Sequence, residues 1–136
     1  MRQRFDLRVY GYVVMPEHVH LLMSEPDQGT LADALHFLKL AFSKRLPHGR
    51  GQATGTFWQK RYYDRNVRDA EEFQRKLRYL HRNPVKRGLV RDPLDWKWSS
   101  FRHYLLREKG PVEIESEWTA VDREVGAAPR IFFRPQ

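Results

Sequence analysis

Two histidines at positions 18 and 20 have the spacing in this chain that points most directly to chemistry. If their segment is a β-strand, side chains two residues apart point to the same face, and His18 and His20 stand about 7 Å apart along it. Two imidazoles at that spacing can reach one divalent ion, but they cannot fill its coordination shell. The pair therefore predicts either half of a metal site or two partly exposed strand histidines without a ligand.

A second set of polar residues falls on a helix predicted to begin after Asp69. Asp69 and Glu72 have the spacing of a helix-capping pair. Pro84 disfavours helical geometry in the residue before it, so the helix is expected to end near Asn83. Its apolar stripe consists of Ala70, Phe73, Leu77 and Leu80. At about 100° per residue, Tyr79 lies far from the centre of that stripe.

Tyr79, Asn83 and Lys76 therefore form a polar ridge on this helix. A tyrosine can attack the phosphorus of a phosphodiester and keep the bond energy in a phosphotyrosine, which a second hydroxyl can then displace. An Asn four residues after the Tyr can supply a third ligand beside the two histidines. Such ligands suit Mg²⁺ or Mn²⁺, and the histidines leave Zn²⁺ open. The alternative is that Tyr79 is a rim tyrosine that shields the core.

The charge distribution favours a nucleic-acid partner. Of the net charge of +8, residues 57–106 contribute +7 from 13 basic and 6 acidic side chains, interleaved with aromatic residues. Cations suit phosphates and aromatic faces suit bases, although a solvated basic face is the simpler alternative. The cations that we expect to contact phosphates are Lys60, Arg61, Arg65, Arg75 and Lys76.

The remaining composition narrows the class of protein. The chain has no cysteine, which excludes disulfides and thiolate zinc sites. It has no apolar run of about 20 residues that would cross a membrane, and its N-terminus lacks the apolar core of a signal peptide. We therefore expect a cytoplasmic protein that is not bound to a membrane.

Two strands are expected to carry the histidines. Residues 5–15 alternate between apolar and polar side chains, and residues 18–23 resume the pattern. The histidine face of the second strand is expected to be the more open one, opposite Val19, Leu21 and Met23. Thr30 and Asp33 resemble the capping box of a further helix, and residues 57–67 are predicted as one strand or an irregular hairpin.

Four segments together resemble one known family. They are Met15–Leu22, Phe57–Gln59 with Tyr62–Asp64, Tyr79–Val90 and Trp96–Ser100. The first is similar to the His-hydrophobe-His signature of the single-tyrosine HUH transposases. The four segments in this order resemble the REP-associated tyrosine transposases. The histidine pair is a weak signal by itself, whereas the ordered set is highly specific.

The resemblance implies a ferredoxin-like α+β domain, with an antiparallel sheet and helices on one face, that acts on single-stranded DNA with hairpins. By position, His18 and His20 match the metal ligands, Asn83 the additional ligand and Tyr79 the nucleophile. The implied reaction is metal-dependent cleavage and strand transfer through a covalent 5′-phosphotyrosine, as in DNA transposition.

Three further residues are candidates for the same roles. Tyr62 and Tyr63 are rival nucleophiles that lie in the aromatic-basic segment and not on the helix. His81 is adjacent to the ridge in sequence, but at helical spacing it points away from Tyr79 and Asn83. We therefore expect His81 to have no ligand role.

One departure from the family pattern affects the expected domain. Members normally have a strand and a helix before the strand expected at residues 5–15, and without that first strand the edge beside the histidine strand is unpaired. The chain is then a fragment, its true start lies upstream, or a second copy or another partner fills the gap. Residues 1–106 are predicted as the truncated catalytic domain and residues 107–136 as a C-terminal tail.

Two other functions stay open at this point. The first is a DNA-hairpin-binding module, a truncated or domesticated relative that does not cut DNA. The second is a metal-dependent phosphodiesterase that uses water in place of the tyrosine.

Overall fold

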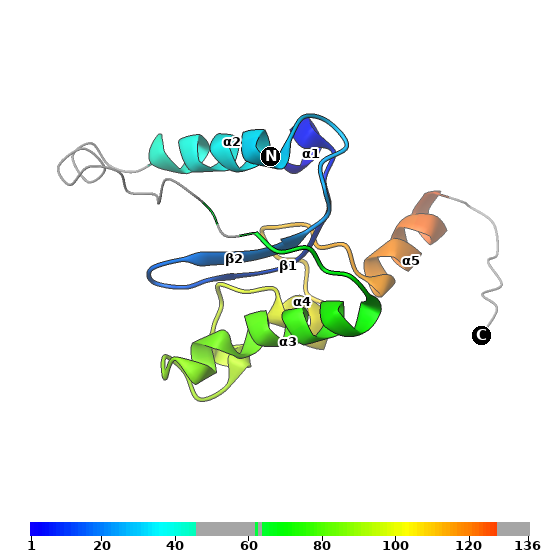
Figure 1. Ribbon diagram of the computed structural model, residues 1–136. Helices are drawn as coiled ribbons and strands as arrows, with labels where there is room; N and C mark the ends of the chain where they lie inside the picture. Colours follow the sequence, from blue (N-terminus) through cyan, green and yellow to red (C-terminus); the bar gives the residue numbers. More distant parts are fainter. Residues whose placement is uncertain (46–61, 63, 128–136) are drawn as a thin grey trace. The chain divides into compact units, whose positions relative to one another are not determined.

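The computed structural model describes residues 1–45, 62 and 64–127, and it has the predicted α+β class (Figure 1). Its elements are α1 (Arg2–Phe5), β1 (Val9–Val14), β2 (Val19–Met23), α2 (Leu31–Ser43), α3 (Ala70–Lys86), the 3₁₀ helix η1 (Pro93–Asp95), α4 (Phe101–Leu106) and α5 (Glu117–Ala127). Within the described part of the chain, no helix is long and apolar enough to cross a membrane.

The chain divides into two compact units. The first comprises Met1–Leu7 and Glu25–Phe73, and the second comprises Arg8–Ser24 and the residues from Gln74 onward. Helix α3 begins in the first unit and continues into the second. We describe each unit by itself.

The first unit is built on α1 and α2. The rings of Phe5 and Phe37 meet edge to face with centroids 5.8 Å apart. Thr30 and Asp33 form the predicted capping box, in which each side chain bonds the other residue's backbone N–H. The expectation that a strand starts at Phe5 is wrong. Phe5 ends α1, and Asp6 in the left-handed conformation turns the chain before β1.

The second unit contains the antiparallel sheet, in which the two predicted strands, β1 and β2, pair directly as a hairpin. Val13 pairs with His20 and Gly11 pairs with Leu22. On the other edge of β1, an isolated bridge joins Val13 to Ser99. Among the described residues, β2 pairs only with β1, so its second edge has no strand beside it.

Helices α3 and α4 lie on the same side of these two strands (Figure 1). The core on that side joins Val13 and Met15 of the hairpin region to Leu80 of α3, with Leu22 packed against them. Since paired residues on adjacent strands share a face, His20 points to the same side as Val13. The expectation that the histidine face is the open one is therefore wrong, because that face is the one covered by α3.

Helix α3 also runs further than expected, through Pro84 to Lys86. Pro84 is fully buried, and this packing offsets the backbone hydrogen bond that a proline cannot make. The chain leaves the helix after Lys86, and Gly88, two residues on, takes a φ of 71°. Gly88 N–H bonds to Val85 O and Leu89 N–H bonds to Pro84 O, the pair of bonds that defines a Schellman motif.

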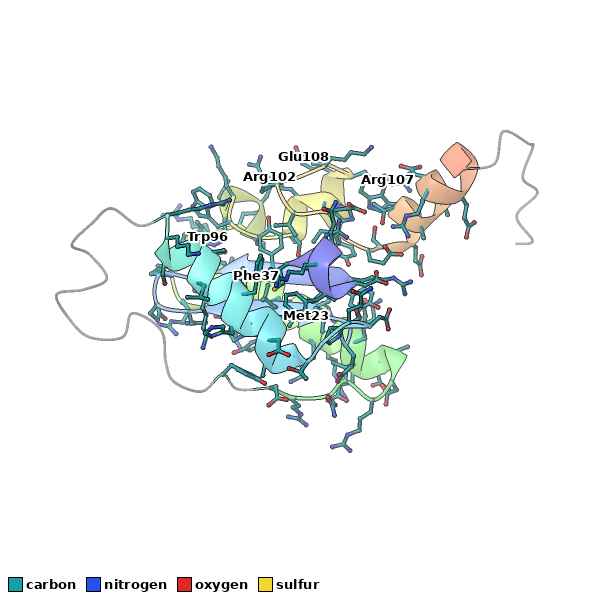
Figure 2. The ribbon with its side chains drawn as sticks, turned by 90° about the horizontal axis from the view of Figure 1, so that it is seen from above. Met23, Phe37, Trp96, Arg102, Arg107 and Glu108 are labelled. Carbon is teal, nitrogen blue, oxygen red and sulfur yellow. The ribbon has the colours of Figure 1, made fainter. Side chains whose placement is uncertain are left out.

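The described residues after 106, up to 127, are part of the second unit, where we expected a tail. Ile114 is buried, and the N–H of Glu115 donates to Val9 O at 2.8 Å. The loop before α4 also packs on the sheet, because Trp96 Nε1 donates to Val14 O at 3.0 Å. Trp96 is labelled among the side chains in Figure 2. The predicted strand at 57–67 lies largely outside the described residues, and its described positions 62 and 64–67 have no regular structure.

Candidate metal and nucleophile site

His18 directly precedes β2 and His20 lies within it, and their rings are neighbours. Their ring centroids are 4.6 Å apart, with the planes inclined by 81°. Both side chains are half-buried. Burial, and then the neighbouring His18, lower the pKa of His20, so it is held in the neutral form that binds metals. The predicted pair is thus brought together on one face.

Tyr79 of α3 reaches the same place. Its ring centroid is 5.7 Å from that of His20, with an interplanar angle of 80°. The Tyr79 side chain is 48% exposed, so a large substrate has access to it. Lys86 Nζ stands 5.8 Å from the Tyr79 ring centroid, in cation–π range. A phenol, a cation and two imidazoles therefore converge.

Asn83 lies one helical turn after Tyr79 but differs from the expected exposed ridge. It is only 5% exposed, and its Nδ2 has no hydrogen-bond partner among the described residues. The NH2 group is a donor and does not bind a cation, so a metal ion would have to be bound through Oδ1. No third His, Cys, Asp or Glu completes a metal cluster with the two histidines in the described ranges. The residues present therefore fit a divalent ion held by two imidazoles and one amide.

The predicted phosphate contacts are only partly described. Lys60 and Arg61 lie outside the described residues. Arg65, in the first unit, has its Nε 3.7 Å from Glu72 Oε1. The carboxylate partly balances its positive charge, which leaves less of that charge for a phosphate. Arg75 is exposed on α3 and Lys76 is half-buried, within one turn before Tyr79.

Helix α3 carries further exposed cations that the sequence reasoning missed. They are Arg78, Arg82 and Lys86, and Arg87 follows directly after the helix. At 100° per residue, Arg78 lies about 100° from Tyr79 around the helix axis. The other three cations and Arg75 lie within roughly 90° of Tyr79. The seven-residue spacing from Tyr79 to Lys86 could have predicted that Lys86 lies on the Tyr79 face. That prediction required α3 to continue through Pro84.

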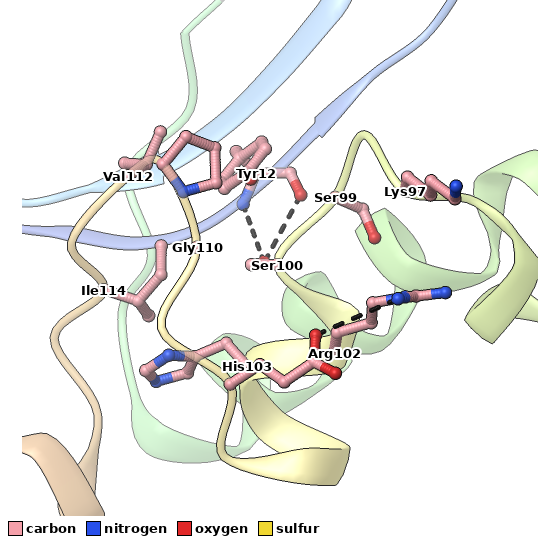
Figure 3. Close-up of a pocket in the computed structure, with 11 residues that line it drawn as sticks. Tyr12, Lys97, Ser99, Ser100, Arg102, His103, Gly110, Val112 and Ile114 are labelled. Carbon is pink, nitrogen blue, oxygen red and sulfur yellow. Dashed lines mark hydrogen bonds and ion pairs between the residues drawn. The ribbon is translucent and has the colours of Figure 1, made fainter.

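His81 belongs to a different part of the unit, as expected. Its Nε2 is 2.8 Å from Ser100 Oγ, and burial lowers its pKa to about 4. Ser100 Oγ in turn bonds the backbone of Tyr12, beside a cavity of about 190 Å³ (Figure 3). None of the predicted site residues lines that cavity. Tyr62 is exposed in the first unit, and Tyr63 lies outside the described residues.

Comparison with known proteins identifies the family of the chain. The family model described as "Transposase IS200 like" matches residues 1–83. A Haemophilus influenzae protein classed as a REP-associated tyrosine transposase is 29% identical over 120 residues, covering 82% of this chain and 68% of the relative. The REP-associated tyrosine transposase of Escherichia coli K12 is 26% identical over 123 residues, covering 90% of this chain and 69% of the relative.

A solved structure has the same fold. It is a REP-associated tyrosine transposase bound to a REP hairpin, with a TM-score of 0.66 and 23% identity, and the match covers 85% of this chain and 67% of that one. The family match spans more than half of the chain, and the motifs, the fold and the relatives agree. The chain therefore belongs to the IS200-like transposase family, in which its relatives are REP-associated tyrosine transposases.

Proposed function

We propose that this chain cuts and rejoins single-stranded DNA that carries a hairpin, with Tyr79 as the nucleophile. The observation that supports this most strongly is the placement of the Tyr79 ring 5.7 Å from the His20 ring. The hairpin substrate is taken from the solved relative, whose structure holds a REP hairpin. The exposed cations of α3 provide the charge that a DNA backbone requires.

In this reaction the phenol oxygen of Tyr79 attacks the phosphorus of the scissile phosphodiester. The phenol proton passes to solvent, the bond from phosphorus to the 3′-oxygen breaks, and that oxygen leaves as a 3′-hydroxyl. The DNA downstream of the cut stays attached as a 5′-phosphotyrosine. A second 3′-hydroxyl then attacks the same phosphorus and releases Tyr79, so the strand is rejoined without ATP.

His18, His20 and Asn83 would hold a divalent ion, Mg²⁺ or Mn²⁺, beside Tyr79. When bound, such an ion polarises a phosphoryl oxygen as a Lewis acid. The chain's own contribution is positional. β2 and the residue just before it carry the two imidazoles, α3 presents Tyr79 and Asn83 one turn apart, and Lys86 stands near the Tyr79 ring.

The test uses the full chain with a 3′-labelled single-stranded hairpin oligonucleotide and Mn²⁺. The label should migrate with the protein on a denaturing gel, and chelation of the ion should abolish this adduct. Tyr79→Phe should form no adduct, while Tyr62→Phe and Tyr63→Phe should form it normally.

The alternatives give different results in this assay. An adduct that is lost in Tyr63→Phe and kept in Tyr79→Phe would assign the nucleophile elsewhere. Binding of the hairpin without an adduct under any divalent metal would make the chain a DNA-hairpin-binding module. Cleavage without an adduct that survives Tyr79→Phe would make it a phosphodiesterase that uses water.

A further inference from the structure

Glu17, in the turn between β1 and β2, contacts both halves of the candidate site. One carboxylate oxygen, Oε1, lies 3.3 Å from His18 Nδ1. The same oxygen accepts a hydrogen bond from Arg87 Nη2, although the two residues are 70 positions apart in sequence. Arg87 follows directly after α3, the helix that carries Tyr79 and Asn83. A single oxygen therefore links the histidine strand to the end of the nucleophile helix.

The position of this oxygen has a consequence for His18. A histidine binds a metal through one ring nitrogen, and its other N–H usually points to a carboxylate that fixes the tautomer and the ring orientation. A proton on Nδ1 would face Glu17 Oε1, and the lone pair of Nε2 would then be left for an ion. Glu17 is not itself part of a three-residue metal cluster in the described part of the chain.

We propose that Glu17 and Arg87 are positioning residues of the metal site. Glu17 holds His18 with Nε2 toward the ion, and Arg87 holds Glu17. This inference rests on the proposed function, since it takes His18 to be a metal ligand. It adds Glu17 and Arg87 to the candidate site. Their ion pair links the turn before β2 to the end of α3.

Both partners of the ion pair stand on ordered backbone. The turn that carries Glu17 is closed by the N–H of Met15, which donates to His18 O at 2.8 Å. The N–H of Arg87 donates to Asn83 O at 2.9 Å, so Arg87 is tied to the turn that bears the proposed third ligand. As a surface ion pair it is half-exposed and contributes little to folding stability. Its loss should therefore change metal binding without changing the melting temperature appreciably.

The experiment measures Mn²⁺ affinity of the full chain by the electron paramagnetic resonance signal of free Mn²⁺, without DNA. Glu17→Gln should weaken Mn²⁺ binding by about 10-fold to 100-fold, as expected for loss of a carboxylate behind a ligating histidine. Arg87→Gln should weaken it in the same direction, and Arg87→Lys should restore part of the loss. The matched control is Arg123→Gln, which breaks the exposed pair with Glu115 (2.6 Å) and should leave Mn²⁺ binding unchanged.

Arg87→Gln separates positioning from simple charge. If Glu17 acted only as a negative charge or a direct ligand, removing the nearby cation would strengthen or preserve Mn²⁺ binding, and that result would overturn the inference. The double variant should bind no more weakly than Glu17→Gln, because Arg87 acts through Glu17.

The same titration separates this inference from the proposed metal site. His18→Gln and His20→Gln should each abolish Mn²⁺ binding. If they do and Glu17→Gln binds as wild type, the positioning role is wrong while the site stands. If the wild-type chain binds no Mn²⁺, the metal site and the positioning role both fail.

Discussion

The His20 ring on β2 and the Tyr79 ring on α3 lie 5.7 Å apart, edge to face. This distance is set by the packing of α3 on the sheet, since Leu80, next to Tyr79, joins the core cluster with Val13, the strand partner of His20. The candidate site is therefore built on the packed interface of one strand and one helix. Such a framework holds a nucleophile and its metal ligands more firmly than loops would.

Replacement of His20 tests the metal's role in the reaction. His20→Gln should reduce adduct formation by on the order of 10²-fold, because Lewis-acid stabilisation of a phosphoryl transition state amounts to several kcal/mol. Added chelator should then have little further effect on the variant, whereas it should abolish the wild-type adduct. His36→Gln, at an exposed position of α2, is the control. Equal adduct yields for His20→Gln and His36→Gln would remove His20 from the site.

Lys86 is expected to orient the Tyr79 ring. Its Nζ lies 5.8 Å from the ring centroid, and an exposed cation–π contact contributes about 0.5–1 kcal/mol. Lys86→Met should therefore slow adduct formation roughly 2- to 5-fold at saturating DNA. Lys109→Met, at an exposed position after α4, should have no effect. An increase in the Kd for DNA with an unchanged rate at saturation would instead make Lys86 a phosphate contact.

Features that depend on neighbours in sequence could be predicted reliably. The capping box of Thr30 and Asp33 involves residues three apart, so its bonds form wherever the helix starts. The two strands around His18 and His20 were likewise predicted from alternation on both sides of a short interruption, although their pairing as a hairpin was not. These local signals do not depend on what packs against them.

The open histidine face was predicted wrongly because a strand by itself does not reveal which side a helix covers. Leu22 gives the histidine face an apolar residue as well, and α3 packs there. The alternation in residues 5–13 had already placed Val13 on the buried side. Combined with the antiparallel pairing of Val13 and His20, that alternation would have identified the covered face.

The end of α3 was predicted wrongly for a related reason. The penalty of Pro84 is local, whereas the burial that offsets it comes from the rest of the unit. The three extra residues, Pro84 to Lys86, bring Lys86 near Tyr79 and place Arg87 against Glu17. The contact between Glu17 and Arg87 could therefore not be predicted, because the rule that a helix ends before proline holds for an isolated helix.

Buried His81 should make folding stability depend on pH. Its pKa is about 4 in the folded chain, below the ordinary histidine value of 6.5 expected when the chain is unfolded, because burial disfavours the charged ring. Between these values the unfolded chain binds the proton first, so the free energy of unfolding falls as pH drops through 6.5 and levels off near 4. The total loss is about 3 kcal/mol. Burial also lowers the pKa of His103, which acts in the same direction.

Urea unfolding across this pH range measures the effect. His81→Gln should flatten most of the pH dependence below 6.5, and the part due to His103 should remain. His36→Gln should preserve the wild-type curve, because His36 is exposed. A wild-type stability that stays constant from pH 7 to pH 4 would show that His81 titrates normally in the folded chain.

Gly11 sets how closely β1 approaches α3. A Cβ at this position would stand 2.7 Å from Leu77 Cδ1 and 3.4 Å from both Leu80 Cδ1 and Ser100 Oγ. Replacing a glycine also restricts the unfolded chain, which favours folding by about 0.4–1 kcal/mol. Overpacking a filled core costs about 1–3 kcal/mol, and Leu77 and Leu80 are buried, so the cost should prevail.

Gly11→Ala should thus lower the free energy of unfolding by about 1–2 kcal/mol, the overpacking cost less the gain from the unfolded chain. It should also slow adduct formation, because α3 must shift to relieve the contact and Tyr79 shifts with it. In a Leu77→Val background the same change should cost less, since the contacting methyl group is gone. Gly110→Ala is the control, because a Cβ there meets nothing within 4 Å. Equal costs for Gly11→Ala with and without Leu77→Val would mean that the sheet and helix do not meet at Gly11.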